Sequence, residues 1–192
     1  HHAQLLASGS APVDLMISLE MIGYFSDVSN SQDFPWVGLR LMYPTVGNFI
    51  AIVSRPADWR QTRALKSHMQ GASPLPVHSI NAPPWVPGID LSDHRSYWAE
   101  GIPALMVTDT AFYRNDQYHQ PGDVASRLDY RRMGHVVQGV FAFITRPVGK
   151  SCTSTVMSES TNTSASMSRW GRTNRSPRRG VQRRPASRRA SA

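Results

Sequence analysis

The chain has 192 residues, of which 40% are hydrophobic, so it is long enough to bury one core of ordinary domain size. Its formal net charge of +8 would indicate an acidic partner only if the charge were evenly distributed. Residues 151–192 hold nine Arg and one Glu, whereas residues 1–150 hold twelve basic and twelve acidic residues. The first part of the chain is therefore neutral, and the tail carries the whole excess.

The cysteine content and the start of the chain exclude several features. Cys152 is the single cysteine, so no disulfide can form within the chain. No apolar run approaches the roughly 18 residues of a membrane-spanning helix, and residues 1–4 show no secretory signal pattern. Residues 3–6 read like the continuing end of a helix. We therefore interpret the chain as a truncated natural sequence.

The first half of the chain predicts two strands and one helix. Residues 14–20 form an apolar run with a polar end, typical of a strand buried on both faces. A Gly, Ser and Asn-rich stretch at 23–38 separates it from a second apolar run at 48–53, which we interpret as another strand. Residues 56–71 begin with Pro and an acid and end at a Gly, which predicts a surface helix.

The next segment predicts two more strands around a short helix. Residues 77–80 are a strand candidate, and the prolines within 83–87 favour a loop. Ser92 is placed to cap a helix over about 93–100. Residues 104–108 then read as a buried strand.

The last part of the domain contains a long loop and a final helix. The loop to Ser126 is polar and aromatic, and loops of this length in compact domains are usually functional. A helix is expected from about Leu128, and its apolar stripe consists of Met133, Val136, Val137, Val140, Phe141 and Ile144. The alternation of strands and helices predicts an α/β fold with a layered sheet.

After Gly149 the composition changes to Ser, Thr and Arg without periodicity, which predicts a disordered tail over 151–192. Its arginines could contact nucleic-acid phosphates. We favour a solvated tail or an out-of-frame reading at the end of the gene. Because Trp170 is the only aromatic residue there, no specific nucleic-acid partner is expected.

Three segments place polar side chains beside strand ends, where open α/β sheets form their sites. They are Glu20, the pair Asp93 and His94, and the loop from Asp109 to His119. Each has a commoner explanation when taken alone. A strand-ending Glu is usually solvated, a histidine in a turn-rich loop usually lies at the surface, and an Asp before a helix often caps it.

Several short strings carry more information than the single residues. They occur in the order and spacing of the co-catalytic zinc aminopeptidases of metallopeptidase family twenty-eight, whose relatives include glutaminyl cyclases and glutamate carboxypeptidases. The likeness runs from about His2 to Arg146 and excludes the tail. The strings are Ser18-Leu19-Glu20-Met21-Ile22-Gly23-Tyr24, Ser92-Asp93-His94, Gly101-Ile102-Pro103-Ala104, Thr108-Asp109-Thr110-Ala111 and Tyr118-His119-Gln120-Pro121-Gly122-Asp123.

The resemblance implies a three-layer α/β/α sandwich with a mixed sheet and two zinc ions bridged by an aspartate and a water. In that family the acid of the Leu-acid-Met string binds one zinc, which maps to Glu20, although the family more often has Asp there. The histidine of the Tyr-His string binds the other zinc and maps to His119. The Glu carboxylate at this position offers zinc a hard oxygen ligand, as the Asp carboxylate of the family does.

The same resemblance implies supporting roles for three further residues. Asp93 and His94 match a string that forms an outer layer of the metal site or a wall of the substrate pocket. Asp123 matches an acid that orients the loop or the liganding imidazole. Gln120 and Val124 stand where the family often has Thr.

The remaining functional residues of the family have no counterpart here. The family's other zinc ligands all precede the Leu-acid-Met string. They are the histidine of a His-x-Asp string, the bridging aspartate and the glutamate that directly follows the general-base glutamate. Only nineteen residues precede Glu20, and neither His1 nor His2 is followed by an acid two positions later. No catalytic residue is therefore assigned, because the general-base glutamate has no counterpart here. The two mapped ligands also cannot close a tetrahedral zinc site.

We therefore expect part of a zinc-dependent aminopeptidase that removes amino-terminal residues from peptides with metal-activated water, and we expect this chain alone to be inactive. Two alternatives stay open. One is a glutaminyl cyclase of the same fold, which the Ser18 to Gly23 string and the Thr108 to Ala111 loop disfavour. The other is a non-catalytic fragment or a basic binding protein.

Overall fold

The computed structural model describes residues 1–9 and 12–146. These residues belong to the first of the two units into which the chain divides, His1–Lys150. The predicted disorder of residues 151–192 and the predicted role of their arginines lie outside the described residues.

Four strands form one mixed sheet in the order β1-β4-β2-β3. They are β1 (Met16–Leu19), β2 (Ile50–Ser54), β3 (Val77–Asn81) and β4 (Ala104–Thr108). β1 runs parallel to β4 and β2 runs parallel to β3, while β2 and β4 are antiparallel. All four strands lie where the sequence predicted them.

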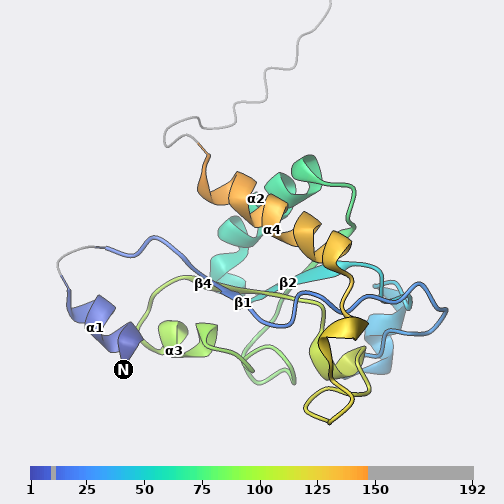
Figure 1. The fold of residues 1–192 in the computed structure, drawn as a ribbon. Coiled ribbons are helices and arrows are strands. Elements are labelled where there is room, and N and C mark those ends of the chain that lie inside the picture. Colours follow the sequence, from blue (N-terminus) through green and yellow to red (C-terminus); the bar gives the residue numbers. More distant parts are fainter. Residues whose placement is uncertain (10–11, 147–192) are drawn as a thin grey trace, which may run out of the picture. The chain divides into compact units, whose positions relative to one another are not determined.

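Helices cover both faces of the sheet (Figure 1). The long helices α2 (Trp59–Ala72) and α4 (Tyr130–Ile144) pack on one face, and the short helices α1 (His2–Ser8) and α3 (His94–Ala99) lie on the other. This arrangement confirms the α/β/α layering. No helix in the described part of the chain has the length and apolar character needed to cross a membrane.

The described residues also contain four short 3-10 helices. The sequence predicted residues 56–58 as the first turn of the helix over 56–71, and it predicted no helix at the other three. One follows the first loop, one precedes α2, and two lie in the long loop between β4 and α4. They are η1 (Val37–Leu41), η2 (Pro56–Asp58), η3 (Ala111–Tyr113) and η4 (Ala125–Arg127).

The two central strands separate two apolar clusters. Alternate side chains of β2 and β4 point to opposite faces, so Ile52 and Val107 pack with α2 while Val53 and Met106 pack with Trp98 of α3. Every residue of these two strands is buried. Burial on both faces explains why the two segments read as continuous apolar runs.

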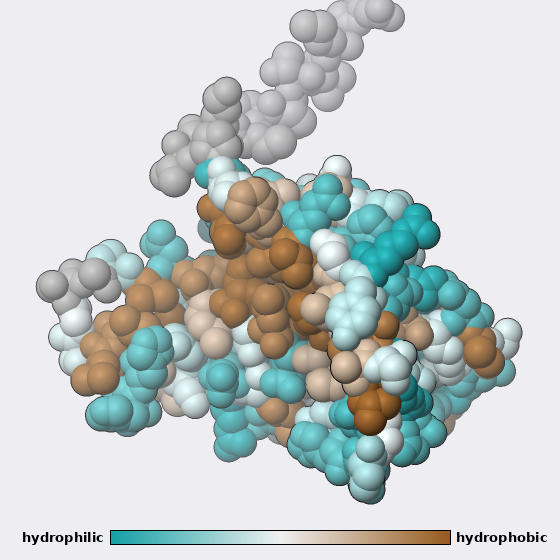
Figure 2. All heavy atoms as spheres, viewed as in Figure 1, coloured by the Kyte–Doolittle hydropathy of each residue, from teal (hydrophilic) through white to brown (hydrophobic). Residues whose placement is uncertain are grey.

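The outer strand β1 and the final helix are less buried than their sequences predicted. Ser18 is buried, but Leu19 is 47% exposed, so the expectation that β1 is buried on both faces was wrong. On α4, Val136 and Phe143 are buried, whereas the stripe residues Val137 and Phe141 are exposed. Figure 2 shows apolar side chains gathered on this side of the molecule, over α4 and towards β1.

A close contact between α2 and α4 depends on a residue without a side chain. A Cβ atom added at Gly139 of α4 would lie 2.9 Å from Cγ and 3.0 Å from Cα of Met69. Met69 is buried in the core beneath this contact. Gly139 therefore sets how closely the two helices approach.

Replacing two glycines of α4 by alanine should change stability in opposite directions. Gly139→Ala forces Met69 and the backbone of α2 to move, and we expect it to lower the free energy of unfolding by about 1–3 kcal/mol. At Gly134 no atom lies within 4 Å of the position that a Cβ would occupy, so Gly134→Ala should raise it by about 0.5–1 kcal/mol. Urea unfolding of both variants measures the two changes, and equal shifts would contradict the packing.

Candidate functional site

The carboxyl ends of β1 and β4 meet at one edge of the sheet because the two strands are parallel. Glu20 follows β1 and remains tied to the sheet, since its backbone N–H donates to the Val107 carbonyl at 3.0 Å. Asp109 follows β4 directly. The two carboxylates that end these strands therefore belong to the same edge.

Asp109 is buried and acts as an acceptor for backbone groups of two loops. Its Oδ2 accepts the N–H groups of Gly23 at 3.0 Å and Tyr24 at 2.7 Å, and its Oδ1 accepts the N–H of Ala111 at 3.0 Å. Burial raises the pKa of Asp109 to about 6, although these bonds and the charge of Arg114 act in the opposite direction. Asp109 therefore holds the chain after β1 against the chain after β4.

Arg114 is buried beside Asp109 and binds the chain at three positions. Its Nη1 donates to the carbonyls of Tyr24 at 3.2 Å and Phe49 at 2.9 Å, and its Nε donates to Gln32 Oε1 at 2.9 Å. Burial lowers its pKa to about 10, and the negative charge of Asp109 opposes this shift. The guanidinium thus stays a cation at neutral pH and orders the loops around the site.

Glu20 is half-buried and is held by a chain of two hydroxyl groups. Ser92 Oγ donates to Glu20 Oε2 at 3.0 Å. Ser92 Oγ also lies 2.8 Å from Ser18 Oγ, so the Ser18 hydroxyl is the donor in that pair. The expected role of Ser92 as a helix cap was wrong, because α3 begins at His94 and the hydroxyl is bound to Glu20 instead.

Asp93 and His94 have different environments. Asp93 is exposed, and its side chain makes no capping hydrogen bond to α3. His94 is buried against Trp98, with its Nε2 2.6 Å from the Ile89 carbonyl. Its Nδ1 has no hydrogen-bond partner among the described residues.

The charge state of His94 follows from this environment. Burial lowers its pKa, while the Ile89 carbonyl and the charges of Asp90, Asp93 and Glu20 act in the opposite direction. The imidazole is therefore neutral at pH 7. Because the Ile89 carbonyl can only accept, Nε2 carries the proton and Nδ1 keeps its lone pair.

The loop after β4 carries His119 and Asp123. His119 is exposed, has φ of 58°, and its ring stacks on Tyr118 with the centroids 3.9 Å apart. Asp123 Oδ1 accepts a hydrogen bond from Asn115 Nδ2 at 3.0 Å, which closes the loop on itself. Burial raises the pKa of Tyr118, and the negative charge of Glu20 adds to this rise. Tyr118 thus contacts the ring of His119 and lies within range of the charge of Glu20.

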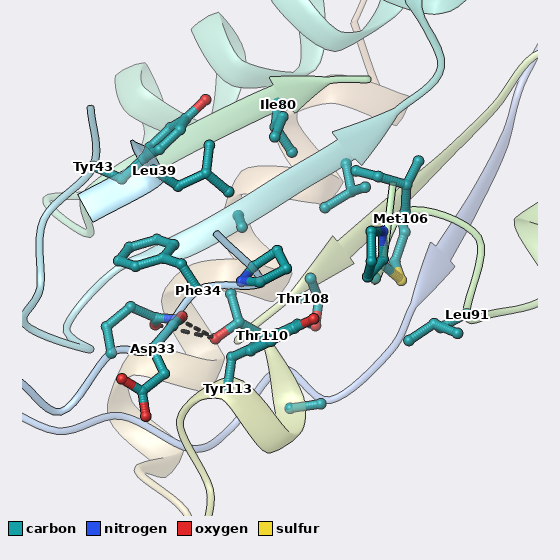
Figure 3. Close-up of a pocket in the computed structure, with 18 of the residues that line it drawn as sticks. Asp33, Phe34, Leu39, Tyr43, Ile80, Leu91, Met106, Thr108, Thr110 and Tyr113 are labelled. Carbon is teal, nitrogen blue, oxygen red and sulfur yellow. Dashed lines mark hydrogen bonds between the residues drawn. The ribbon is translucent and has the colours of Figure 1, made fainter. Parts of the chain in front are cut away.

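A largely apolar cavity of about 140 Å³ opens beside Glu20 (Figure 3). Its walls come from the α3 face of the sheet, from η1 and from the loops after β3 and β4. Glu20, Asp33 and Tyr118 lie on its lining, but His119 does not. The apolar residues labelled in the close-up are Phe34, Leu39, Ile80, Leu91 and Met106.

The described residues do not complete a metal site. Within residues 1–9 and 12–146, no three His, Cys, Asp or Glu side chains are grouped so that they could hold a metal ion. Glu20 carries oxygen atoms and His119 carries nitrogen atoms, which are of the kinds that zinc accepts as ligands. Two ligands leave a tetrahedral site open, so any zinc here needs ligands from elsewhere.

Comparison with known proteins identifies the family. The model of peptidase family M28 matches residues 3–144. The chain belongs to peptidase family M28. A relative, the uncharacterised protein YfbL of Escherichia coli strain K12, is 49% identical over 138 residues, which are 72% of this chain and 43% of that protein.

Solved structures agree with this family at the level of the fold. LapA aminopeptidase of Legionella pneumophila superposes with a TM-score of 0.54 at 22% identity, over 74% of this chain and 33% of LapA. LapB of the same organism gives 0.55 at 18% identity over 74% and 33%. The chain spans less than half the length of the relatives it matches.

Sequence reasoning missed the residues that hold the site together. Ser18, Gln32 and Arg114 are buried polar side chains, but each reaches its partner through a contact between distant parts of the chain. Ser92 was singled out by its string but assigned the wrong role. The one local signal for Arg114 is its position in the long loop after β4. Its burial, which is rare for a charged side chain, is visible only in the structure.

The stability of the wild type relative to Asp109→Asn should fall as pH rises from about 4 to 6. The folded-state pKa of about 6 exceeds the ordinary value of 3.8, so in this window the folded protein keeps a proton that the unfolded chain releases. Over this pH range the free energy of unfolding of the wild type should therefore fall by about 3 kcal/mol relative to that of the variant. Urea unfolding at several pH values tests this, and a constant difference would contradict it.

Proposed function

We propose that this chain is part of a peptide hydrolase that removes amino-terminal residues from peptides. The observation that supports it most is the apolar cavity beside Glu20, at the sheet edge where β1 and β4 end. Membership of a peptidase family and the likeness of the fold to LapA aminopeptidase support the same activity. An apolar cavity at this edge suits a substrate whose first side chain is apolar.

We further propose that Glu20 and His119 bind zinc, with the remaining ligands supplied by a part of the protein that this chain does not span. Zinc in such a site would supply an activated water for attack on the peptide carbonyl. The hydroxyl of Ser92 holds Glu20 Oε2, so one carboxylate oxygen is oriented before any ligand arrives. The isolated chain is then inactive, because its described residues form no closed metal site and no general base has been assigned in it.

The other residues take supporting roles in this proposal. Asp123 fixes the loop that carries His119 through its bond to Asn115. His94 is neutral and buried, and its Nδ1, which has no partner among the described residues, can accept one hydrogen bond. Asp93 is exposed, and its negative charge acts on the pKa of His94.

The cavity fits one apolar side chain. Its volume of about 140 Å³ is similar to that of an engineered protein cavity of about 150 Å³ that binds benzene. Leucine and phenylalanine side chains are the closest natural matches in size and polarity. We therefore propose that substrates begin with such a residue.

Activity should appear only in a longer protein and should depend on both proposed ligands. The test is a chimera in which residues 3–144 replace the matching region of the E. coli relative. With zinc, the chimera should hydrolyse leucyl p-nitroanilide, and the 192-residue chain should not. Glu20→Ala and His119→Ala should each lower kcat/KM by at least about 1,000-fold and reduce bound zinc.

A variant of Asp123, a proposed supporting residue, provides the comparison with the two proposed zinc ligands. Asp123→Ala should lower kcat/KM by only about 10–100-fold, because it acts through the loop. Bound zinc measured by mass spectrometry separates loss of metal from loss of folding. Turnover that survives His119→Ala would remove the basis of the metal assignment.

The cavity assignment has a matched pair of variants on one 3-10 helix. Leu39 lines the cavity, whereas Leu41 is 90% exposed and does not. In the chimera, Leu39→Arg places a charge in the apolar pocket and should lower kcat/KM for the leucyl amide by at least about 10-fold. Leu41→Arg should leave it unchanged, and equal effects of the two variants would show that the cavity does not bind substrate.

A further inference from the structure

The loop that carries His119 has to be held in place, because its backbone is strained. His119 has φ of 58°, which lies in the left-handed region that is unfavourable for a residue with a Cβ. Its side chain is exposed and stacks on the ring of the neighbouring Tyr118. Neither feature fixes the imidazole relative to Glu20. A strained conformation persists only where surrounding contacts impose it.

Asn115 joins the two ends of this loop. The residue is 1% exposed, and its Nδ2 donates to Asp123 Oδ1 at 3.0 Å. Its Oδ1 accepts the Gln117 N–H at 3.1 Å and Arg127 Nη1 at 2.8 Å. A guanidinium can only donate, so Arg127 requires the oxygen of the amide on its own side. The amide nitrogen is thereby left to donate to the Asp123 carboxylate.

Arg127, in η4, also contacts the chain that follows β1. Its Nη2 donates to the Tyr24 hydroxyl at 3.1 Å, and its guanidinium carbon lies 4.9 Å from the centre of the Tyr24 ring. The backbone N–H of Tyr24 is bound to Asp109, so Tyr24 is itself fixed at the sheet edge. Tyr24 lies four residues after Glu20. Arg127 therefore connects the loop of one proposed zinc ligand to the segment that follows the other.

A third contact of Arg127 lies at the surface and contributes less. Nη2 also donates to Asp116 Oδ1 at 2.8 Å, but the Asp116 side chain is 75% exposed, and ion pairs in water stabilise little. The Arg127 side chain itself is only 27% exposed. The contacts that order the loop are therefore those with Asn115 and Tyr24.

We propose that Arg127 is a positioning residue for the proposed metal site: its two donors set the Asn115 amide and hold the loop of His119 against the segment that follows Glu20. This inference rests on the proposed function, because His119 contributes to catalysis only as a zinc ligand. Lysine cannot replace Arg127, since a single ammonium lacks the planar fork of donors that reaches Asn115 and Tyr24 together.

The ordering of the loop is tested on the 192-residue chain without metal. The Gln117 amide should exchange hydrogen at least about 10-fold faster in Arg127→Met, which keeps a long side chain but removes its donors. The Met106 amide of the central strand β4 should not change, which shows that the fold is intact. Arg131→Met, at an exposed arginine of α4, should leave both amides unchanged. Wild-type exchange of Gln117 in Arg127→Met would overturn the proposal.

The effect on the metal site is measured in the chimera with the E. coli relative. Zinc affinity, determined by competition with a chelator, should fall by about 10–100-fold in Arg127→Met, because the contacts around a metal-binding histidine have effects of this size. Arg131→Met should bind zinc as the wild type does. Arg127→Lys should not restore the affinity, and full recovery in that variant would show that charge alone matters and would contradict the positioning role.

A double variant separates positioning through the loop from a general loss of stability. Because Arg127 acts through Asn115 on the bond to Asp123, the variant with both Arg127→Met and Asp123→Ala should lose about as much zinc affinity as the more affected single variant. Effects that multiply would show that Arg127 acts by another route, which rules out the proposal. A wild-type chimera without zinc-dependent turnover would instead contradict the proposed function, while hydrogen exchange still decides whether Arg127 orders the loop.

Discussion

The buried carboxylate of Asp109 is the constraint on which the rest of the site depends. Three backbone N–H groups from two loops converge on its oxygens, so the segment that follows β1 and the segment that follows β4 cannot move independently. Glu20 lies just before one of these loops and Tyr118 lies in the other, and both line the same cavity. Burying a carboxylate is unfavourable, and the nearby charge of Arg114 offsets part of that penalty.

The mixed sheet explains why these loops meet beside the cavity, because β2 runs opposite to β1 and β4. β1 and β4 end at the edge where the antiparallel β2 begins, so Phe49, just before β2, lies close enough for its carbonyl to accept from Arg114. The guanidinium also lies 4.7 Å from the centre of the Phe49 ring. A cation that is hydrogen-bonded and placed over a ring is stabilised when removed from water. One arginine therefore joins three loops around the cavity.

The sequence predicted the parts of this structure that depend on local patterns. The apolar runs of β2 and β4 indicated the strands, and strand ends indicated the position of Glu20. The hydroxyl chain to Glu20 joins residues 72 positions apart, and the Arg114 to Gln32 bond joins residues 82 apart, so no local pattern indicates either. The periodicity of α4 identified its apolar side chains but not what covers them, which is why the burial of Phe141 was overestimated. The metal roles of Glu20 and His119 stay predictions.

The pairing of β1 with β4 also affects how the protein is made. The register joins Met16 to Ala104, and at about 5–20 residues per second Met16 leaves the ribosome roughly 4 to 18 s before its partner. During this interval β1 is an unpaired apolar strand of a nascent chain. Chaperone binding or aggregation then competes with correct folding, and any strand that pairs with its other edge during synthesis would shorten the period of exposure.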